Sequence, residues 1–496
     1  MRAKRLLLSG LATLVCGASL FAAAASAPLA DAAEKMDRAA IRALLQQRAD
    51  VNAPQVDGMT ALHWAAYHDD VETASLLVRA GARVNVANRY GIWPLTLAIL
   101  SGNSALVDVL LNGGADPNTT VPGGETALMT AARVGTLATV KALLARGARV
   151  DAKDERRGQT ALMWAAAEGH ANVVETLIEM GGDFKARLAS GFTPFLFAVR
   201  EGHIDVARTL LKAGVDVNEP VPVEGSRRGY GGRMPPAGTS PLLLAVMNGH
   251  FELASVLLDA GANPNADLTG YTVLHMLTRV RKPGAGDNDP APEGSGSISS
   301  IELVKKLVAR GANVNARMTR RGNLNNTRFN EIGATPFMLA ALTADAELMR
   351  TLAALGADPN LKNVENSTAL MAAAGLGTRS PGEDAGTEAE VLEAVKVALE
   401  LGADINAHDV NGETAMHGAA YKNLPNVVKF LASKGARITI WNKENKFGWT
   451  PLAIAVGYRF GNFKPSPPTE AMLREVMIAN GVTPPKTINA KTQQIY

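Results

Sequence analysis

The chain has 496 residues, of which 47% are hydrophobic, and a formal net charge of +3. The apolar content is sufficient for a large hydrophobic core, and so small a net charge is not that of a protein that binds nucleic acid through bulk charge. A single cysteine, Cys16, excludes a disulfide framework and a cysteine-based zinc site.

The first residues have the pattern of a secretory signal peptide. Basic residues at positions 2, 4 and 5 precede an apolar run of small residues from 6 to 27, and two A-x-A sites stand at 25–27 and 30–32. We therefore predict that residues 1–32 are a signal peptide and that the protein is periplasmic or secreted.

Two alternatives concern how this leader is processed. Pro28 directly follows the first A-x-A site and disfavours cleavage after Ala27, so cleavage after Ala32 is preferred. A lipid anchor on Cys16 is not expected, because Val15 replaces the small residue that such an anchor needs before its cysteine. No later segment approaches about 18 consecutive apolar residues, so we expect no membrane insertion once the signal is removed.

Beyond the leader, a T-x-L motif recurs, with a glycine at a fixed distance after it. Thr60 precedes Gly81 by 21 residues, and Thr126 and Thr160 precede Gly147 and Gly181 by the same 21. Motif starts at 60, 93, 126, 160 and 193 are about 33 residues apart. A fixed period of this size predicts a solenoid of stacked repeats.

Each repeat predicts two short helices. Thr60 is a suitable N-cap for the first helix, and in several units a proline follows at the first helical position, as at Pro94. The second helix ends at a glycine such as Gly81, a typical C-cap. Residues 33–53 are predicted to be an N-terminal capping half-unit, with one helix that starts at Ile41.

These residues resemble the ankyrin repeat. The matching segments are Gly58-x-Thr60-x-Leu62-His63-x-Ala65-Ala66, the Gly-His pairs at 169–170, 202–203 and 249–250, and the G-A-D-x-N ends at 114–118 and 402–406. The resemblance covers nearly all of residues 37–482. It implies an all-α repeat solenoid of eleven helix–turn–helix units with β-turn or hairpin fingers between units, preceded by the half-unit. The first helices start at 60, 93, 126, 160, 193, 240, 272, 335, 368, 414 and 450.

The predicted array spans residues 54–482, followed by a C-terminal tail at 483–496, and five insertions interrupt it. Two enlarge fingers, at 219–238 and 320–333, and three separate the helices of one unit, at 281–300, 375–387 and 457–469. Long surface insertions cost little free energy. Finger insertions lie where the resemblance places the binding edge, and we expect a binding role from them more than from the other three.

The resemblance also implies which positions face a partner: those around the finger glycine and the pair after the Ala-Ala of the first helix. In this register the candidate partner-binding residues are Tyr67, His68, Arg89, Tyr90, Arg133, Arg156, Arg157, Phe192, Arg200, Tyr271, Arg279, Tyr421, Lys422, Phe447, Trp449 and Tyr458, and the first finger insertion adds Arg227, Arg228 and Tyr230.

The tyrosines support this assignment. Of the seven in the chain, five fall on these positions and a sixth, Tyr230, lies in a finger insertion. Tyrosine and arginine are enriched at binding hot spots, although tyrosines also favour half-exposed helix ends. Trp64 and Trp164 occupy a slot that is usually leucine, and we expect them in the core between units.

Nothing in the sequence indicates catalysis. His63, His275 and His417 occupy the fourth position of the T-x-L-H motif, where the resemblance implies a structural hydrogen bond. No phosphate loop, nucleophile elbow or metal-ligand spacing is present in the sequence. We therefore predict no catalytic residues, no metal and no cofactor.

The sequence thus predicts a binding protein rather than an enzyme. We expect it to hold another protein on its concave face and finger tips, as a scaffold, adaptor, inhibitor or assembly factor, and to be monomeric on its own, without nucleic acid. A glycan or cell-wall polymer is the alternative ligand, because aromatic and arginine side chains suit it too. An enzyme that uses the inserted loops is a more remote alternative.

Overall fold

A computed structural model describes residues 27–222, 235–284, 292, 296–322, 324, 327–459 and 465–488. Within these residues all regular secondary structure is helical, apart from one isolated bridge between Thr120 and Thr126. The chain divides into two compact units at Arg156–Arg157, of which unit 1 contains helices α1–α8 and unit 2 contains α9–α25. The expected all-α repeat array is confirmed.

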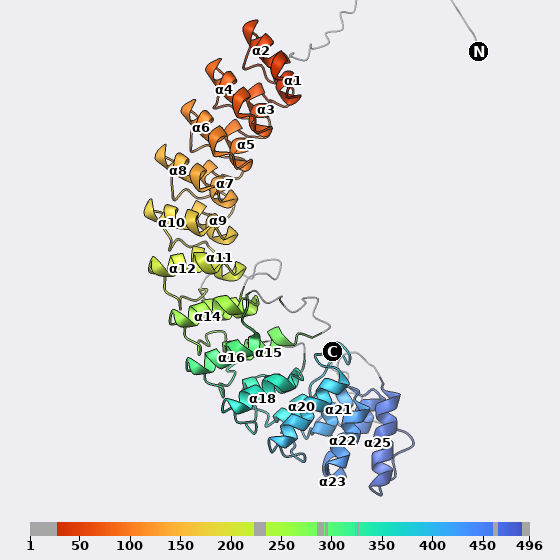
Figure 1. Ribbon diagram of the computed structural model, residues 1–496. Helices are drawn as coiled ribbons and strands as arrows, with labels where there is room; N and C mark the ends of the chain where they lie inside the picture. Colours follow the sequence, from red (N-terminus) through yellow and green to blue (C-terminus); the bar gives the residue numbers. More distant parts are fainter. Residues whose placement is uncertain are drawn as a thin grey trace, which may run out of the picture. The chain divides into compact units, whose positions relative to one another are not determined.

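Unit 1 has two layers of helices (Figure 1). The first layer contains α1 (Pro28–Glu34), α3 (Ala61–Tyr67), α5 (Pro94–Leu100) and α7 (Ala127–Val134). The second contains α2 (Arg38–Gln46), α4 (Val71–Arg79), α6 (Ser104–Asn112) and α8 (Leu137–Ala145). Each first helix packs on the next one in its layer, and each pair packs together.

Unit 2 repeats the same two layers (Figure 1). Its first helices are α9 (Ala161–Glu168), α11 (Pro194–Glu201), α13 (Pro241–Met247), α15 (Val273–Arg281), α17 (Pro336–Leu342), α19 (Ala369–Ala373), α21 (Ala415–Tyr421) and α24 (Pro451–Val456). Its second helices are α10 (Ala171–Glu179), α12 (Ile204–Lys212), α14 (Phe251–Asp259), α16 (Ser300–Ala309), α18 (Ala346–Ala354), α20 (Glu388–Glu400), α22 (Pro425–Ser433) and α25 (Pro467–Ala479). The short α23 (Ile438–Trp441) lies between α22 and α24 in the chain.

All eleven predicted first helices are present, and each begins at the residue after its expected cap. The Thr126 side chain accepts from the Met129 amide at 3.2 Å, and Thr335 accepts from Met338 at 3.2 Å. Such caps satisfy amides that the helix leaves unpaired. Trp93 replaces the capping threonine of the second repeat, and it makes no cap bond, because an indole has no acceptor for a helix amide. Its Nε1 donates instead to the Thr120 carbonyl at 2.8 Å.

Asparagines join successive second helices. Asn85 Nδ2 donates to the Gly114 carbonyl at 2.8 Å, and Asn85 Oδ1 accepts from the Asp116 amide at 2.8 Å. Asn265 makes the same pair of bonds in unit 2, to the Gly311 carbonyl and from the Asn313 amide. A helix C-terminus presents unpaired carbonyl groups. Each of these asparagines donates to one such carbonyl group in the next repeat.

The segment before the first predicted unit contains one helix more than expected. Besides α2, which is the helix of the predicted half-unit, residues Pro28–Glu34 form α1. Leu29 and Ala30 are buried, and α1 packs on α3. The segment 28–32, which was assigned to the signal peptide, therefore belongs to the packed array in this structure.

Three repeats have a long loop between their two helices. Helix α15 ends at Arg281 and α16 begins at Ser300, and the loop between α19 and α20 runs from 374 to 387. The third loop is shorter than expected, because α25 begins at Pro467. Most of the finger insertion 320–333 is described, whereas much of 219–238 lies outside the described residues.

Candidate functional site

Three aromatic rings cluster at the C-terminal end of α3 in unit 1. The Trp64 and Tyr67 rings are 5.6 Å apart, and the Tyr67 and His68 rings are 5.2 Å apart. Trp64 Nε1 donates to Gln55 Oε1 at 2.6 Å, and His68 Nε2 lies 2.9 Å from the Glu34 carbonyl. These bonds fix two rings, while Tyr67 remains 61% exposed. Trp64, which was expected in the core, is only half-buried.

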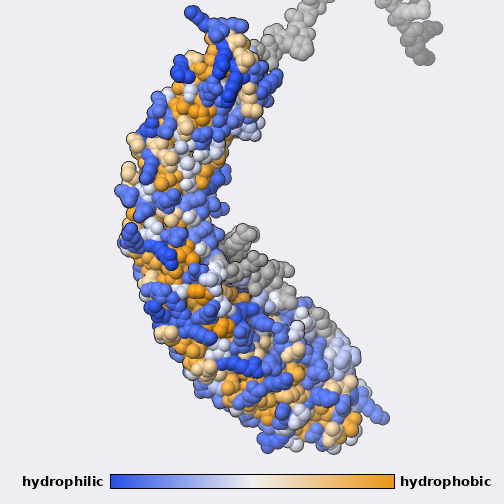
Figure 2. Space-filling view, in the orientation of Figure 1, coloured by the Kyte–Doolittle hydropathy of each residue, from blue (hydrophilic) through white to orange (hydrophobic). Residues whose placement is uncertain are grey.

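Two finger tips lie beside each other in the same unit. The Arg89 amide donates to the Asp57 carbonyl at 2.8 Å, and the Arg89 guanidinium donates to the Val56 carbonyl. Val56 is 71% exposed and Tyr90 is 67% exposed. We call Val56, Trp64, Tyr67, His68 and Tyr90 the aromatic surface. On the visible face of unit 1 in Figure 2, apolar and polar residues are interspersed, so exposed apolar groups there are small and local.

The remaining candidates in unit 1 are arginines that contact their own array. Arg133 pairs with Glu125 at 3.2 Å and is partly exposed. Arg156 is exposed, and its side chain lies against Gly123 of the preceding finger. Arg157, the first residue of unit 2, is also exposed.

Five residues of unit 2 that were predicted to contact a partner are instead buried: Phe192, Tyr271, Tyr421, Lys422 and Trp449. The insertions explain three of these. Gly322 of the finger insertion lies against the Tyr271 ring. The loop 375–387 covers the end of α21, because the Lys422 ammonium donates to the Ala385 carbonyl and Gly375 lies against the Lys422 side chain. Leu376, Gly377 and Thr378 of this loop line the same pocket as Tyr421, whose hydroxyl donates to Glu413 of its own repeat at 2.8 Å.

Phe192 and Trp449 are buried by neighbours within their own repeats. Phe192 packs edge-on against Phe197 at 5.2 Å, and the half-exposed Arg200 guanidinium covers both rings at 5.3 and 5.1 Å. Trp449 lies 5.3 Å from Phe447 within one finger. In each case the bulky ring fills the base of a finger, and Arg200 or Phe447 forms the outer layer.

The other candidates of unit 2 are half-buried or lie outside the described residues. Arg279 and Phe447 are half-buried and line a pocket, and Tyr458 is half-buried with its hydroxyl donating to the Ile488 carbonyl at 3.2 Å. Arg227, Arg228 and Tyr230 lie outside the described residues.

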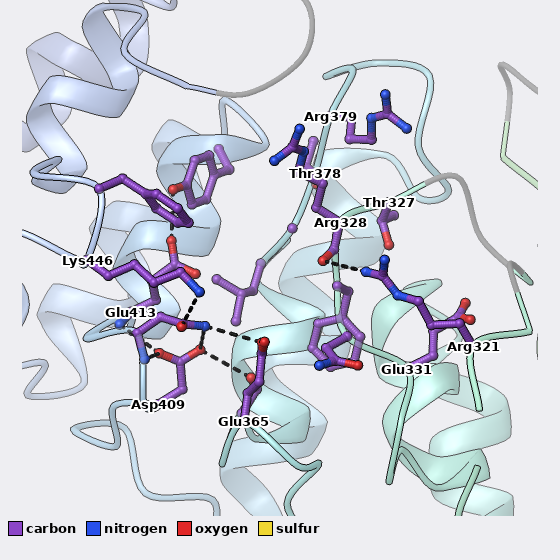
Figure 3. Close-up of a pocket in the computed structure, with 18 of the residues that line it drawn as sticks. Arg321, Thr327, Arg328, Glu331, Glu365, Thr378, Arg379, Asp409, Glu413 and Lys446 are labelled. Atoms are coloured by element: carbon purple, nitrogen blue, oxygen red, sulfur yellow. Dashed lines mark hydrogen bonds between the residues drawn. The ribbon is translucent and has the colours of Figure 1, made fainter. Parts of the chain in front are cut away.

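The pocket in unit 2 has a volume of about 670 Å³. Four fingers, the loop after α19 and the end of α15 contribute to it. Its charged lining residues are Arg279, Arg321, Arg328, Glu331, Glu365, Arg379, Asp409, Glu413 and Lys446, and its apolar ones include Leu324, Phe329, Leu376 and Phe447. Figure 3 shows Glu365, Asp409 and Glu413 with Lys446 on one wall, and Arg321, Arg328 and Arg379 with Glu331 on the other. We call these the acidic and the basic wall after their predominant charges.

The acidic wall is a hydrogen-bonded network. Asp409 accepts from the amides of Asn411 and Glu413 at 2.8 and 2.9 Å, and Glu413 accepts from Tyr421 and from Asn445 Nδ2, both at 2.8 Å. Burial raises the pKa of Asp409, and burial raises the pKa of Glu413 to about 7. In these hydrogen bonds the two buried carboxyl groups accept from backbone amides, a tyrosine and an asparagine, and not from a basic side chain.

The opposite wall is basic and exposed. Arg321, Arg328 and Arg379 are all exposed at the pocket rim. The pKa of Arg328 is lowered, first by burial and then by the positive charges of Arg379 and Arg321. Each neighbouring positive charge disfavours the charged form of the Arg328 guanidinium.

Sequence reasoning identified only part of this pocket. The predicted contact residues included Arg279, Phe447 and Tyr421, but not Arg321, Arg328, Arg379 or Glu413. Three arginines within the finger insertion 320–333, at positions 320, 321 and 328, were the available signal. The loop after α19 gave no such signal, because it contains a single arginine, Arg379, and nothing in its sequence places it beside the finger insertion.

In the described ranges no three His, Cys, Asp or Glu side chains are grouped so that they could hold a metal ion. Among the helices described, none combines the length and hydropathy needed to cross a bilayer.

Models of ankyrin repeats match the chain over most of its described length. The model for three copies matches residues 29–121, 95–187, 128–220 and 386–464, that for many copies matches 195–258, and that for a single repeat matches 332–364. The three-copy model alone matches more than half of the chain. The chain belongs to the ankyrin-repeat family.

Several curated proteins share this ankyrin sequence. The chain is 28% identical over 430 residues to the E3 ubiquitin-protein ligase KEG of Arabidopsis thaliana, which covers 84% of this chain and 21% of the ligase. It is 35% identical over 120 residues to cyclin-dependent kinase 4 inhibitor B of Rattus norvegicus, or 24% of this chain and 91% of the inhibitor. It is 38% identical over 95 residues to Protein PhlB of Serratia liquefaciens, or 19% of this chain and 42% of that protein.

The chain spans only a small part of two of the longer relatives. The chain spans 21% of the length of the plant ligase and 21% of a palmitoyltransferase AKR1 of Lachancea kluyveri. Among solved structures, the human ASB11 ankyrin repeat domain matches at 25% identity with a TM-score of 0.39, over 48% of this chain and 100% of that domain. The comparisons thus establish the repeat family and, with it, a general role in protein–protein interaction.

Proposed function

We propose that this ankyrin-repeat chain is an exported protein that binds a protein partner through the aromatic surface of unit 1, as a scaffold, adaptor, inhibitor or assembly factor. The observation that carries the proposal is the exposure of Tyr67 and Tyr90, at 61% and 67%, beside Val56 at 71%. Large aromatic side chains contribute area and a polar group at low entropic cost, which is why they dominate binding hot spots.

The arrangement of this surface also supports binding. The Gln55–Trp64 and His68–Glu34 bonds hold two of the rings in place, and Arg89 holds the two finger tips together. Contact groups that are fixed before binding lose less conformational entropy when the partner arrives. A relative that covers a quarter of the chain is, by its name, an inhibitor of a kinase, which is the same class of interaction.

A binding role rather than a catalytic one is supported by the histidines. His63 Nδ1 lies 2.8 Å from the Thr60 hydroxyl, and His63 Nε2 lies 3.1 Å from the Ile92 carbonyl. His275 and His417 make the equivalent bonds, each to the capping threonine of its own repeat and to a backbone carbonyl of the following finger, and both are fully buried. Ring nitrogens that bond the backbone in this way serve the fold.

Export through the predicted leader is the second part of the proposal. Because α1 spans Pro28–Glu34 and Leu29 packs in its interior face, cleavage after Ala32 would cut a packed helix. We therefore favour cleavage after Ala27 or before it. The mass of the processed N-terminus in a periplasmic or culture fraction tests this: a start at Ala33 would contradict the revised site, and an unprocessed chain in the cytoplasm would contradict export.

The binding proposal is tested with one variant and one control. The variant is Tyr67→Ala with Tyr90→Ala, and the control is Met180→Ala with Ile478→Ala, which removes exposed apolar groups from the ends of α10 and α25. Buried Tyr271 and Tyr421 are left unchanged, since truncating them would destabilise the fold.

Each bait is used to capture proteins from the native fraction, and the captured protein is identified, purified and titrated. We expect the control to bind like the wild type and the tyrosine variant to bind at least about tenfold more weakly, as for loss of hot-spot residues. Equal affinity of both variants for the purified partner would rule out the aromatic surface. Retention of cell-wall fractions in place of any protein would favour the glycan alternative.

A further inference from the structure

We propose that the pocket in unit 2 binds an acidic peptide segment of a protein partner, whose carboxylates are held by Arg321, Arg328 and Arg379. This inference rests on the proposed protein-binding function and adds a second site with a defined ligand chemistry. Four features of the pocket carry it. These are its exposed positive charge, the contact that holds its arginines close together, its apolar surface at Phe447, and the acidic wall, which disfavours a nucleic acid.

The exposed charge of the pocket is mainly positive. Three of its four acidic groups bond inward, and only Glu365 is half-buried. Glu331 accepts from the amides of Gly322 and Leu324 at 3.0 and 3.1 Å, and it is 3% exposed. Asp409 and Glu413 are likewise buried, at 4% and 8% exposure. Arg321, Arg328 and Arg379 are exposed at the rim, so a ligand entering the pocket meets their guanidinium groups first.

Two insertions hold these arginines close together. Arg328 lies in the finger insertion and Arg379 in the loop after α19, and the Arg328 amide donates to the Gly377 carbonyl at 2.7 Å. Gly377 has a φ of +83°, and a Cβ there would lie 2.4 Å from the Phe329 amide nitrogen, so only glycine permits this contact. Figure 3 shows the Arg328 and Arg379 side chains beside each other on this wall.

Clustered guanidinium groups favour an anionic ligand. The positive charges of Arg379 and Arg321 act on Arg328 and disfavour its charged form. A bound carboxylate would remove this repulsion, and each arginine can offer it two parallel N–H donors. Because the fold already holds the guanidinium groups close together, binding does not have to overcome their mutual repulsion anew.

The rest of the lining distinguishes a peptide from other polyanions. Phe447 is half-buried and lies beside the pocket with the Lys446 ammonium 5.0 Å from its ring centre, so it offers an apolar surface to a side chain. Half-buried Glu365 can accept from a peptide N–H. Glu365 and the acidic wall behind it confine anionic contacts to the arginine side of the pocket, which a peptide with a few carboxylates can satisfy and a nucleic acid backbone, with a phosphate at every step, cannot.

The test uses the full chain and a short fluorescein-labelled peptide in which glutamates flank a leucine. The site variant combines Arg321→Gln, Arg328→Gln and Arg379→Gln. The control variant combines Arg149→Gln, Arg208→Gln and Arg437→Gln, three exposed arginines away from the pocket, so that both proteins lose the same charge. All six positions are exposed, and equal thermal unfolding of the two variants confirms that the fold is retained.

We expect fluorescence anisotropy to show binding of the acidic peptide to the wild type and the control, weakening as salt is added, and a loss of about tenfold or more in the site variant. A peptide with glutamine in place of glutamate should not bind. Equal binding to both variants, or no binding to the wild type, would overturn the proposal. So would preferential binding of citrate or of a labelled RNA oligonucleotide at the same pocket.

The outcome also separates this inference from the proposed function. If the purified partner loses affinity for the Tyr67→Ala, Tyr90→Ala variant but binds the site variant normally, and the acidic peptide does not compete, the pocket proposal fails alone. If the site variant loses the partner and the tyrosine variant does not, the acidic-peptide site stands and the aromatic surface fails.

Discussion

Glu413 is a carboxyl group whose hydrogen-bond partners are neutral. Tyr421 and Asn445 donate to it, and burial raises its pKa to about 7, well above the ordinary value of 4.5. A neutral carboxyl is therefore preferred in the folded protein below that pH. This preference links folding to pH, because the unfolded chain loses the proton from Glu413 at a lower pH than the folded chain does.

The sign of this linkage gives the first residue-scale prediction. Below the unfolded pKa both states are protonated, and as pH rises toward 7 only the unfolded state ionises, so Glu413 lowers the unfolding free energy, by at most roughly 3 kcal/mol. Glu413→Gln keeps the acceptor oxygen and removes the ionisation. Its unfolding free energy relative to wild type should rise between about pH 5 and pH 8, measured by urea denaturation; a constant difference over this range would contradict the prediction.

The comparison with wild type is needed because two histidines act in the opposite direction. Burial lowers the pKa of His275 and of His417 from 6.5 to about 4. The stability that depends on their neutral form is complete above pH 6.5 and is lost as pH falls from there toward 4. Both proteins in the comparison contain these histidines, so their effect cancels in the difference.

Glu125 in unit 1 occupies the same position of the repeat as Glu413, and the two residues show what the sequence pattern can predict. Glu125 stands one residue before its capping threonine, as Glu413 does, and each contacts the side chain eight residues later, Arg133 or Tyr421. The repeat register predicts that contact. It does not predict burial, because Tyr421 and Glu413 are buried by the insertions of neighbouring repeats, and no such insertion covers Glu125, which is half-buried.

At the scale of elements, Arg281 joins the repeat of α15 to the next repeat through two ion pairs, with the buried Asp345 and with the exposed Glu347. Arg281, at the end of α15, donates from Nε to Asp345 Oδ2 at 2.6 Å, and Asp345 also caps α18 by accepting from the Leu348 amide at 3.1 Å. The two side chains are 13% and 2% exposed. The long insertion after α15 is thus bridged at its base.

Asp345 therefore has two functions that substitution can separate. Asp345→Ala removes the cap and leaves the Arg281 charge buried without this partner, and it should cost about 3–5 kcal/mol. Asp345→Asn keeps a cap acceptor and should cost less. Urea denaturation of the two variants measures the difference; equal losses would mean that the ion pair, and not the cap, carries the stability.

Helix boundaries were largely predictable, because Thr, Pro and Gly mark each repeat at fixed positions. Helix α1 was not predicted, since its small apolar residues Leu29 to Ala33 have the composition of a leader and show packing only in three dimensions. The pocket was not predictable either. Gly377 and Arg328 are far apart in the repeat register, and their contact depends on two loops of unique sequence.

At the scale of the whole molecule, each repeat packs mainly against the repeats next to it. In unit 1, α6 contacts α4, α5 and α8, and in unit 2, α20 contacts α17, α18, α19 and α22. The stability of such an array is approximately a sum of terms for single repeats and for neighbouring pairs. Local changes should therefore destabilise neighbouring repeats more than distant ones, and the two compact units should unfold in separable steps.

A core substitution in each unit tests this. Leu110 in α6 and Leu307 in α16 are fully buried, and Leu→Ala at either site should cost about 2–5 kcal/mol. With Leu110→Ala, hydrogen exchange monitored by mass spectrometry should accelerate in α4, α6 and α8 and remain unchanged in α20–α25. With Leu307→Ala, unit 2 should accelerate near α14 and α16 while α2–α6 stay protected. Uniform acceleration along the chain would show that the protein unfolds as one cooperative body, because only global unfolding exposes distant repeats together.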